Sequence, residues 1–317
     1  MDRRQLLLAA VSSLTAGSAG AQPAESETHV QAAALDVLPN LVTRMAVPAR
    51  INGSTPYRFA VDTGASHTSV SEELAQALRL PAGPDVLVNG VTAAVRTSTV
   101  TIARIEVGGA GSFHDILAPV FPQQRLGVDG LLGVDILGRF AVTFNVAHNV
   151  LDLRRRSLGL SFVRGTRLDT TSVLSARQRF GQLNLIDVSA DGVPVQAIID
   201  SGSQYSIGNQ ALYDTVAIRR PDIRDHQWAV PIIGTTGDAV TGRLAVLQNL
   251  RLGPVRFPSL PVIFCDLHIF DLWQLSDRPA LVFGADILQL FESVTIDFPE
   301  REIRFGDPRR PENSGVG

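Results

Sequence analysis

Apolar and polar residues follow the same order in two separate parts of the chain. The first part alternates over residues 41–51 and continues as a strand-like run at 57–61. The second alternates over 183–188 and continues as an apolar run at 195–199. An Asn-Gly or Asp-Gly pair, typical of a turn, separates the two segments each time. Short apolar runs rich in β-branched residues indicate strands buried on both faces, so each part predicts a β-hairpin with a buried second strand.

Each run ends in an aspartate followed by a turn of small residues. The first continues as Asp62-Thr63-Gly64-Ala65-Ser66, and the second as Asp200-Ser201-Gly202-Ser203. Glycine at this place allows the backbone to turn tightly behind the acid. If the two halves brought these carboxylates together, the pair would share one proton and could act as a general acid and a general base.

Four further segments follow each aspartate in the same order. They are a segment of helical period, a hairpin tip rich in small residues, an apolar-glycine segment that leads into a short helix, and a closing strand. In the first half they cover 72–78, 88–95, 130–137 and 140–145, and in the second half 209–213, 233–240, 281–288 and 291–297. This order predicts a duplicated unit that is mostly β, with a few short helices.

Composition agrees with this prediction and excludes several classes of function. The chain has 317 residues, 45% of them hydrophobic, which is enough for one large core or two medium ones. Its 27 glycines and 18 prolines with little charge are typical of a protein of strands and turns. The net charge of −3 and the lack of a basic patch give no reason to expect a nucleic-acid partner. All 28 basic residues are arginine, which excludes a catalytic lysine.

The single cysteine, Cys265, cannot form an internal disulfide, and its apolar setting indicates a buried, inert thiol. Asp266, His268 and Asp271 lie close to it and could be considered as metal ligands. However, the chain has no HExxH motif and only six scattered histidines, so simple loop polarity is the better interpretation. We expect no metal site and no cofactor.

The N-terminus has the pattern of an export signal over residues 1–21. Two arginines precede an apolar run at 6–14, and Ala19-Gly20-Ala21 provides a small-residue cleavage site. The run is too short to span a bilayer as a mature helix, and no second long apolar stretch occurs, so we expect no stable membrane insertion. Both the twin-arginine and the general secretion route fit the paired arginines. Either route predicts a periplasmic or secreted protein with a flexible leader at 22–34.

Asp-Thr/Ser-Gly-Ala/Ser after an apolar strand, present twice, resembles the aspartic peptidases, the superfamily of pepsin and retropepsin. The segments Gly130-Leu131-Leu132-Gly133 and Leu281-Val282-Phe283-Gly284, each ahead of a short helix, resemble the second signature of that superfamily. The resemblance implies an all-β, bilobal acid-protease fold with two related barrel-like lobes, a cleft between them and a few short helices. We accordingly expect an N-terminal lobe at 35–160, a linker at 161–180, a C-terminal lobe at 181–307 and a tail at 308–317.

The same resemblance implies an endopeptidase that needs no cofactor. Asp62 and Asp200 would be catalytic and would activate a water molecule between them. Thr63 and Ser201 resemble the paired hydroxyls that brace the two loops, with support from Gly64, Ala65, Gly202 and Ser203. Ser203 could also donate its hydroxyl to the outer oxygen of Asp200, which Ala65 cannot do for Asp62. Asp135 and Asp286, also duplicated, are interpreted as residues that begin helices.

The two hairpin tips resemble the flaps of a retropepsin dimer, one flap from each half. The residues expected to cover the substrate are Asn89, Gly90, Val91, Thr92, Gly234, Thr235, Thr236 and Gly237. We therefore expect a monomer built like a fused dimer, acting on a polypeptide in extended conformation. The main alternative is a catalytically inactive module that binds peptides on the same fold. A duplication without any site would leave the paired acids and glycines unexplained.

Overall fold

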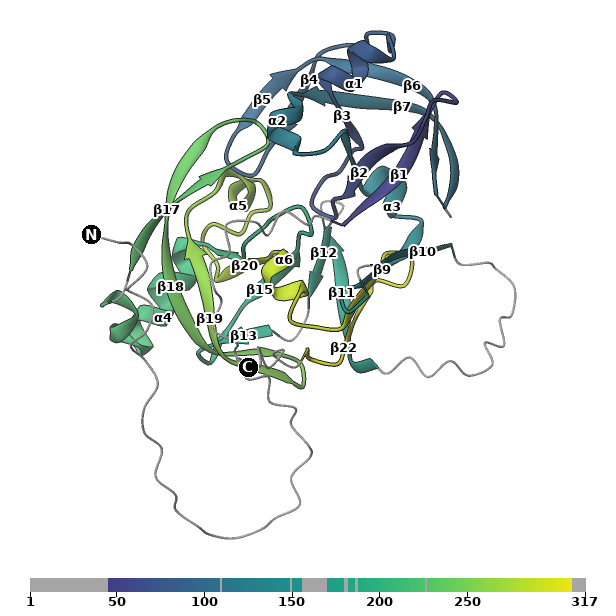
Figure 1. The fold of residues 1–317 in the computed structure, drawn as a ribbon. Coiled ribbons are helices and arrows are strands. Elements are labelled where there is room, and N and C mark those ends of the chain that lie inside the picture. The colour runs from purple at the N-terminus through teal and green to yellow at the C-terminus, as the bar shows by residue number, and fades with distance from the viewer. Residues whose placement is uncertain are drawn as a thin grey trace, which may run out of the picture.

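The computed structural model describes residues 45–108, 110–148, 150–155, 170–179, 182–185, 188–225 and 227–309. Throughout this part the chain is mostly β, with a few short helices (Figure 1). The expected all-β architecture of two related lobes is confirmed. The expected export signal at 1–21 and leader at 22–34 lie outside the described residues, as do 161–169 of the linker and 310–317 of the tail.

The first lobe is a closed barrel. Its strands follow one another around the barrel in the order β1 (Ala46–Ile51), β2 (Tyr57–Val61), β8 (Gly130–Leu132), β3 (Ser69–Ser71), β7 (Gly111–Phe121) and β6 (Thr99–Val107). Buried and exposed residues alternate along β1, whereas the last three residues of β2 are all buried. This lobe also contains α1 (Glu72–Ala77), α2 (Gln123–Leu126), α3 (Val134–Leu137) and the separate hairpin β4 (Val86–Asn89)–β5 (Ala94–Thr97).

The second lobe repeats the pairing of the first. In the first lobe β2 is parallel to β8, while β3 is antiparallel to β8 and parallel to β7. In the second lobe β15 (Gln196–Ile199) is parallel to β20 (Ala280–Phe283), while β16 (Ile207–Gly208) is antiparallel to β20 and parallel to β19 (Val255–Phe264). The internal duplication expected from the sequence is therefore present in the strand pairing.

The remaining elements of this lobe extend its sheet and cover it. They are β12 (Gln182–Leu185), β13 (Val188–Ala190), β14 (Val193–Pro194), β17 (Trp228–Ile233), β18 (Ala239–Leu252), α4 (Gln210–Arg219), the 3-10 helix η1 (Pro221–Arg224), α5 (His268–Leu272) and α6 (Ala285–Leu288). α4 extends well beyond the segment 209–213 that shows helical period, and the Asn209 side chain caps its first turn by accepting from the N–H of Leu212 at 2.9 Å.

A shared sheet joins the two lobes. It runs β10 (Val150–Arg155), β9 (Phe140–Asn145), β21 (Ser293–Asp297), β22 (Glu302–Gly306) and β11 (Thr170–Arg179). The β9–β21 pair links the lobes directly, and the hydroxyls of Thr143 and Thr295 lie 2.9 Å apart across it. Residues 170–179 were expected to be part of the linker, but they form β11. The threonines and the valine of this segment suit a strand, and β22 and β12 provide its partners.

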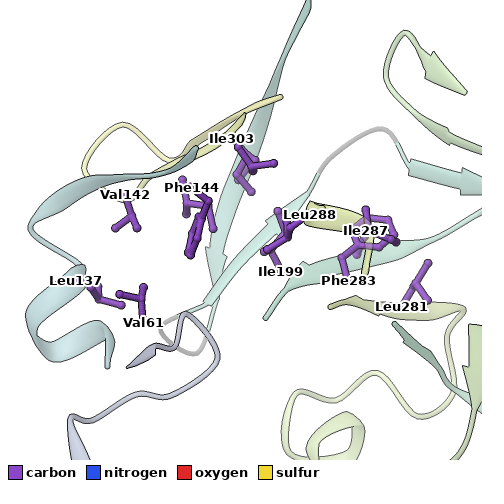
Figure 2. Close-up of a cluster of buried hydrophobic side chains, with 14 of the residues drawn as sticks. Val61, Leu137, Val142, Phe144, Ile199, Leu281, Phe283, Ile287, Leu288 and Ile303 are labelled. Atoms are coloured by element: carbon purple, nitrogen blue, oxygen red, sulfur yellow. The ribbon is translucent and has the colours of Figure 1, made fainter. Parts of the chain in front are cut away.

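The hydrophobic core continues from one lobe into the other. Figure 2 shows Val61, Leu137, Val142 and Phe144 of the first lobe in one cluster with Ile199, Phe283, Ile287 and Leu288 of the second. Val61 and Ile199 are the residues directly before the two aspartates, and their side chains are only 1% and 3% exposed. Burial of each side chain contributes roughly 1.5 to 3 kcal/mol. The core therefore anchors both aspartate loops.

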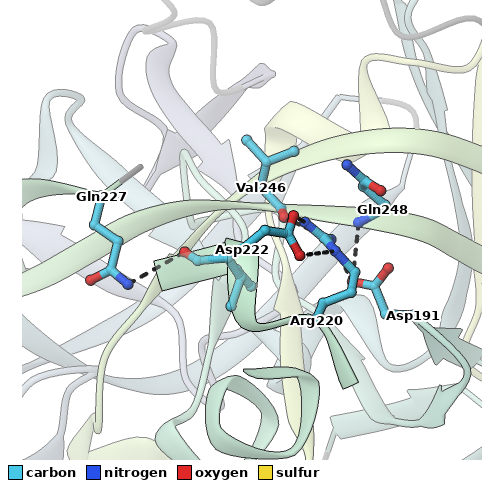
Figure 3. A network of polar contacts seen from close by, with 7 residues as sticks. Asp191, Arg220, Asp222, Gln227, Val246 and Gln248 are labelled. Atoms are coloured by element: carbon cyan, nitrogen blue, oxygen red, sulfur yellow. Dashed lines mark hydrogen bonds and ion pairs between the residues drawn. The ribbon is translucent and has the colours of Figure 1, made fainter. Parts of the chain in front are cut away.

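An ion-pair network fixes the end of α4 to the turn between β13 and β14 (Figure 3). Arg220 donates from Nη1 to Oδ2 of Asp191 at 3.1 Å and from Nη2 to Oδ2 of Asp222 at 2.8 Å. The side chain of Asp191 is 3% exposed and that of Asp222 is 60% exposed. Arg220 thus pairs one buried carboxylate and one that lies in solvent.

Candidate active site

The two aspartates occupy equivalent places at the ends of buried strands. Asp62 follows β2, and its N–H donates to the carbonyl oxygen of Leu132 in β8 at 3.0 Å. Asp200 follows β15, and its N–H donates to the carbonyl oxygen of Phe283 in β20 at 2.9 Å. The two residues are 8% and 7% exposed. Since a buried carboxylate is costly without hydrogen-bond partners, the loops must supply them.

Each loop binds its own aspartate through backbone amides. Oδ1 of Asp62 accepts from the N–H groups of Gly64 and Ala65, both at 3.0 Å. Oδ1 of Asp200 accepts from the N–H groups of Gly202 at 2.8 Å and Ser203 at 3.2 Å. The two loops thus hold their carboxylates with the same pair of bonds, and the acids are oriented alike relative to their own strands.

Each carboxylate also lies against the glycine of the opposite loop. A Cβ atom added to Gly64 would lie 2.4 Å from Cγ of Asp200, and one added to Gly202 would lie 2.4 Å from Cγ of Asp62. No side chain fits at either position, so glycine is needed for the loops to approach so closely. The structure therefore brings the two aspartates, one from each lobe, into a single site.

Four hydrogen bonds brace the two loops across the interface between the lobes. The N–H of Thr63 donates to Oγ of Ser201 at 3.1 Å, and the N–H of Ser201 donates to Oγ1 of Thr63 at 3.0 Å. The two hydroxyls then donate to backbone carbonyls of the opposite strands, Thr63 to Ile199 at 3.2 Å and Ser201 to Val61 at 3.0 Å. Both side chains are buried, so this symmetric arrangement fixes the distance between the loops.

Asp135 and Asp286 lie behind the loops and support them. Oδ1 of Asp135 accepts from the N–H and the hydroxyl of Thr68, and from the N–H of Ile136 in its own helix. Asp286 accepts from the N–H of Ser206 at Oδ2 and from its hydroxyl at Oδ1. Burial raises the pKa of Asp286 to about 6. These contacts agree with their interpretation as residues that begin helices, and they connect each helix to the segment that follows an aspartate.

Ser203 differs from its expected role. Its hydroxyl donates to the carbonyl oxygen of Tyr205 at 2.8 Å, and not to the outer oxygen of Asp200. Because a hydroxyl carries one proton, that proton is used within the turn. Ser203 binds Asp200 through its N–H, as Ala65 binds Asp62. The expected donation from the Ser203 hydroxyl to Asp200 is therefore wrong.

The two hairpin tips, residues 90–93 between β4 and β5 and residues 234–238 between β17 and β18, touch each other. A Cβ atom on Gly90 would lie 2.5 Å from Cγ2 of Thr236, and one on Gly234 would lie 2.5 Å from Oγ1 of Thr92. The hydroxyls of Thr92 and Thr236 are 3.5 Å apart. Each tip thus uses a glycine to accommodate a threonine of the other tip, and the tips meet as a pair.

Two residues that contact the tips were not singled out in the sequence. Arg125 in α2 contacts the second tip, and Ile269 in α5 contacts the first. The helices α2 and α5 follow equivalent strands, β7 and β19, in the two lobes. Alignment of the two halves beyond residues 121 and 264 would have placed these helices at matching positions, although it would not have shown which tip each one touches.

The polar residues near Cys265 have other partners. Asp266 accepts from the N–H of Gln210, and His268 lies 3.0 Å from Oδ1 of Asn89. Within the described ranges, no group of three or more histidine, cysteine, aspartate or glutamate side chains could hold a metal ion. Burial raises the pKa of the Cys265 thiol.

A family model described as aspartyl protease matches residues 47–136 and 186–287. Each matched segment contains one of the two aspartates, and together the segments cover more than half of the chain. The chain belongs to the aspartyl proteases. A match in two segments is consistent with a retropepsin-like protein of two lobes in one chain. No curated protein sequence matches this aspartyl protease. In the part of it that the structure describes, no helix is long and apolar enough to cross a membrane.

Proposed function

We propose that this aspartyl protease is an endopeptidase that hydrolyses peptide bonds with a water molecule activated between Asp62 and Asp200. The observation that carries the proposal is the contact of each carboxylate with the glycine of the opposite loop. Two carboxylates so close together cannot both be charged at low cost, so they share a proton, as in other aspartic peptidases. One carboxylate is then a base and the other an acid.

The reaction follows from the two protonation states of the carboxylates. The charged carboxylate takes a proton from the water as its oxygen attacks the carbonyl carbon of the scissile bond, and the protonated carboxylate donates to the carbonyl oxygen. In the second step the protonated carboxylate gives its proton to the amide nitrogen, the other carboxylate takes a proton from a hydroxyl of the tetrahedral intermediate, and the C–N bond breaks, so the pair is left with one shared proton. The braced loops keep both acids in place, so little reorganisation is needed.

An extended polypeptide is the substrate that suits the two hairpin tips. Both tips present backbone groups and small side chains, which can bind a peptide backbone regardless of its sequence. The N-terminal residues 1–21 support export, so we place the enzyme in the periplasm or outside the cell. We expect it to act as a monomer, because one chain supplies both aspartates.

Hydrolysis of dye-labelled casein by the purified full-length chain tests the proposal. Asp62→Asn and Asp200→Asn should each abolish hydrolysis, and the double variant should be no worse than either single one, since the residues act as a unit. Asp115→Asn is the matched control, because Asp115 is exposed and its positive φ of 55° suits asparagine. If the wild type binds casein without cleaving it, the inactive peptide-binding module is correct instead.

A further inference from the structure

Two short helices hold the hairpin tips, and each holds the tip of the other lobe. Nη1 of Arg125, in α2 of the first lobe, donates to the carbonyl oxygen of Thr236 at 2.8 Å. In α5 of the second lobe, the N–H of Ile269 donates to the carbonyl oxygen of Val91 at 3.3 Å. Figure 1 shows the β17–β18 hairpin extending away from its own lobe to α2 of the first lobe. The attachments are therefore crossed.

The guanidinium of Arg125 makes a second close approach to the same tip. A Cβ atom on Gly237 would lie 2.3 to 2.6 Å from Cζ and both Nη atoms of Arg125. Gly237 also has a φ of +94°, which a side chain would make strained. The turn at residues 234–238 thus has both the carbonyl and the glycine that this arginine needs. Arg125 lies against the turn as well as donating to it.

The two attachments differ in what they are made of. The first tip is bound by the backbone N–H of Ile269, and Val91 packs against the apolar cluster that contains Ile269 and Phe270. The second tip is bound to α2 by the side chain of Arg125. A hydrogen bond from a charged group is stronger than one between neutral groups. One side chain thus attaches the second tip to α2, and it can be replaced without change to the backbone. A further bond to this tip comes from the first tip, where Oγ1 of Thr92 donates to the carbonyl oxygen of Asp238 at 3.4 Å.

We propose that Arg125 is a positioning residue that holds the second hairpin tip closed and so controls peptide entry. The first tip is bound to α5 and the second to α2, so the two tips stay in contact while both attachments hold. A peptide enters when the bond from Arg125 to Thr236 breaks, and the bond forms again behind it. The role of Arg125 in peptide entry rests on the proposed function, whereas its role in holding the second tip closed does not.

Hydrogen exchange of the free, full-length protein tests the hold on the tip. The amides of Gly234 and Gly237 are hydrogen-bonded within the turn, so their exchange reports opening. In an Asp62→Asn background, Arg125→Ala should speed their exchange by about tenfold, which is the loss expected for one charge-assisted hydrogen bond. Arg125→Gln should have a similar effect, and Arg125→Lys a smaller one. Gln124→Ala, an exposed neighbour on the same helix, is the control and should change nothing. Equal exchange in the arginine variants and the parent protein would overturn the proposal.

Kinetics in the active protein test the effect on entry and release. Arg125→Ala should raise KM for labelled casein several-fold and leave kcat unchanged or higher, since the acids are untouched and the tip opens more easily. A lower kcat at constant KM would contradict the proposal. The two proposals fail separately. If the wild type is inactive but Arg125→Ala exchanges faster, only the proposed peptidase activity is refuted. If the wild type is active but exchange is unchanged in Arg125→Ala, only the proposed role of Arg125 is refuted.

Discussion

The carboxylate of Asp200 occupies the space that a side chain on Gly64 would need, since a Cβ atom there would lie 2.4 Å from its Cγ. The reverse holds for Gly202 and Asp62. The backbone of each loop is thus shaped by the acid of the other lobe. The site is formed between the lobes, and neither lobe contains it alone.

Gly64→Ala should therefore inactivate the enzyme without unfolding it. The added methyl group pushes Asp200 from its position, and a displacement of about 1 Å can cost on the order of a hundredfold in rate. Gly108→Ala is the control, because its Cβ would have no neighbour closer than 3.6 Å. Hydrolysis rates and circular dichroism spectra of both variants check this, and an active Gly64→Ala protein would contradict the shared site.

The braced loops predict a different result for Thr63. Thr63→Ala removes the donor to Ile199 and the acceptor for the N–H of Ser201, both buried. An unsatisfied buried group costs about 1 to 3 kcal/mol, so urea unfolding should show a loss of this size together with reduced activity. Thr63→Ser keeps the hydroxyl and should restore most of both. Thr143→Val removes a hydroxyl between the lobes from strand β9, outside both aspartate loops, and should lower stability with activity unchanged.

The buried Asp286 predicts a pH dependence of stability. Its pKa of about 6 in the folded protein, against 3.8 ordinarily, means that the folded state binds the proton more tightly. The contribution of this group to the free energy of unfolding therefore rises as the pH falls through 6 towards 4, by about 3 kcal/mol in all. Urea unfolding of the wild type and Asp286→Asn at pH 7.5, 6 and 4.5 measures it. The free energy of unfolding of the wild type, relative to that of Asp286→Asn, should increase as the pH falls. If the difference between the two proteins is the same at all three pH values, the prediction is wrong.

The network in Figure 3 predicts unequal roles for the two partners of Arg220. Burial raises the pKa of Asp191 even though Arg220 lowers it in part, whereas the hydrogen bond from Arg220 lowers the pKa of the exposed Asp222. Arg220→Ala leaves the Asp191 carboxylate buried without a cation and should cost about 3 kcal/mol of stability. Asp222→Asn should have a much smaller effect on stability, because solvent screens the ion pair of an exposed carboxylate. The double variant Arg220→Ala, Asp191→Asn should recover stability, because it no longer carries the buried charge. If it does not, the buried charge of Asp191 is not the cause of the loss in Arg220→Ala.

The duplication could be read from the sequence because its signals are local. Apolar runs, turn pairs and the segments around Asp62 and Asp200 repeat in order, and burial of those runs also sets the strand pairing. The pairing of β11 with β22 depends on strands far away in the chain, so a segment of serine and threonine gave no sign of it. The direction of the Ser203 hydroxyl and the reach of Arg125 depend on single torsion angles and on the opposite lobe, which no periodic pattern encodes.

The pairing of β9 with β21 has a consequence for how the enzyme responds to dilution. These strands carry five residue pairs between the halves, and one polypeptide connects them. Their encounter is intramolecular, so each half meets the other at an effective concentration on the order of millimolar, whatever the concentration of the protein. An enzyme assembled from two separate chains loses its site when it is diluted below its dissociation constant. We therefore expect the activity per molecule to stay constant on dilution, which would suit the proposed export into a large volume.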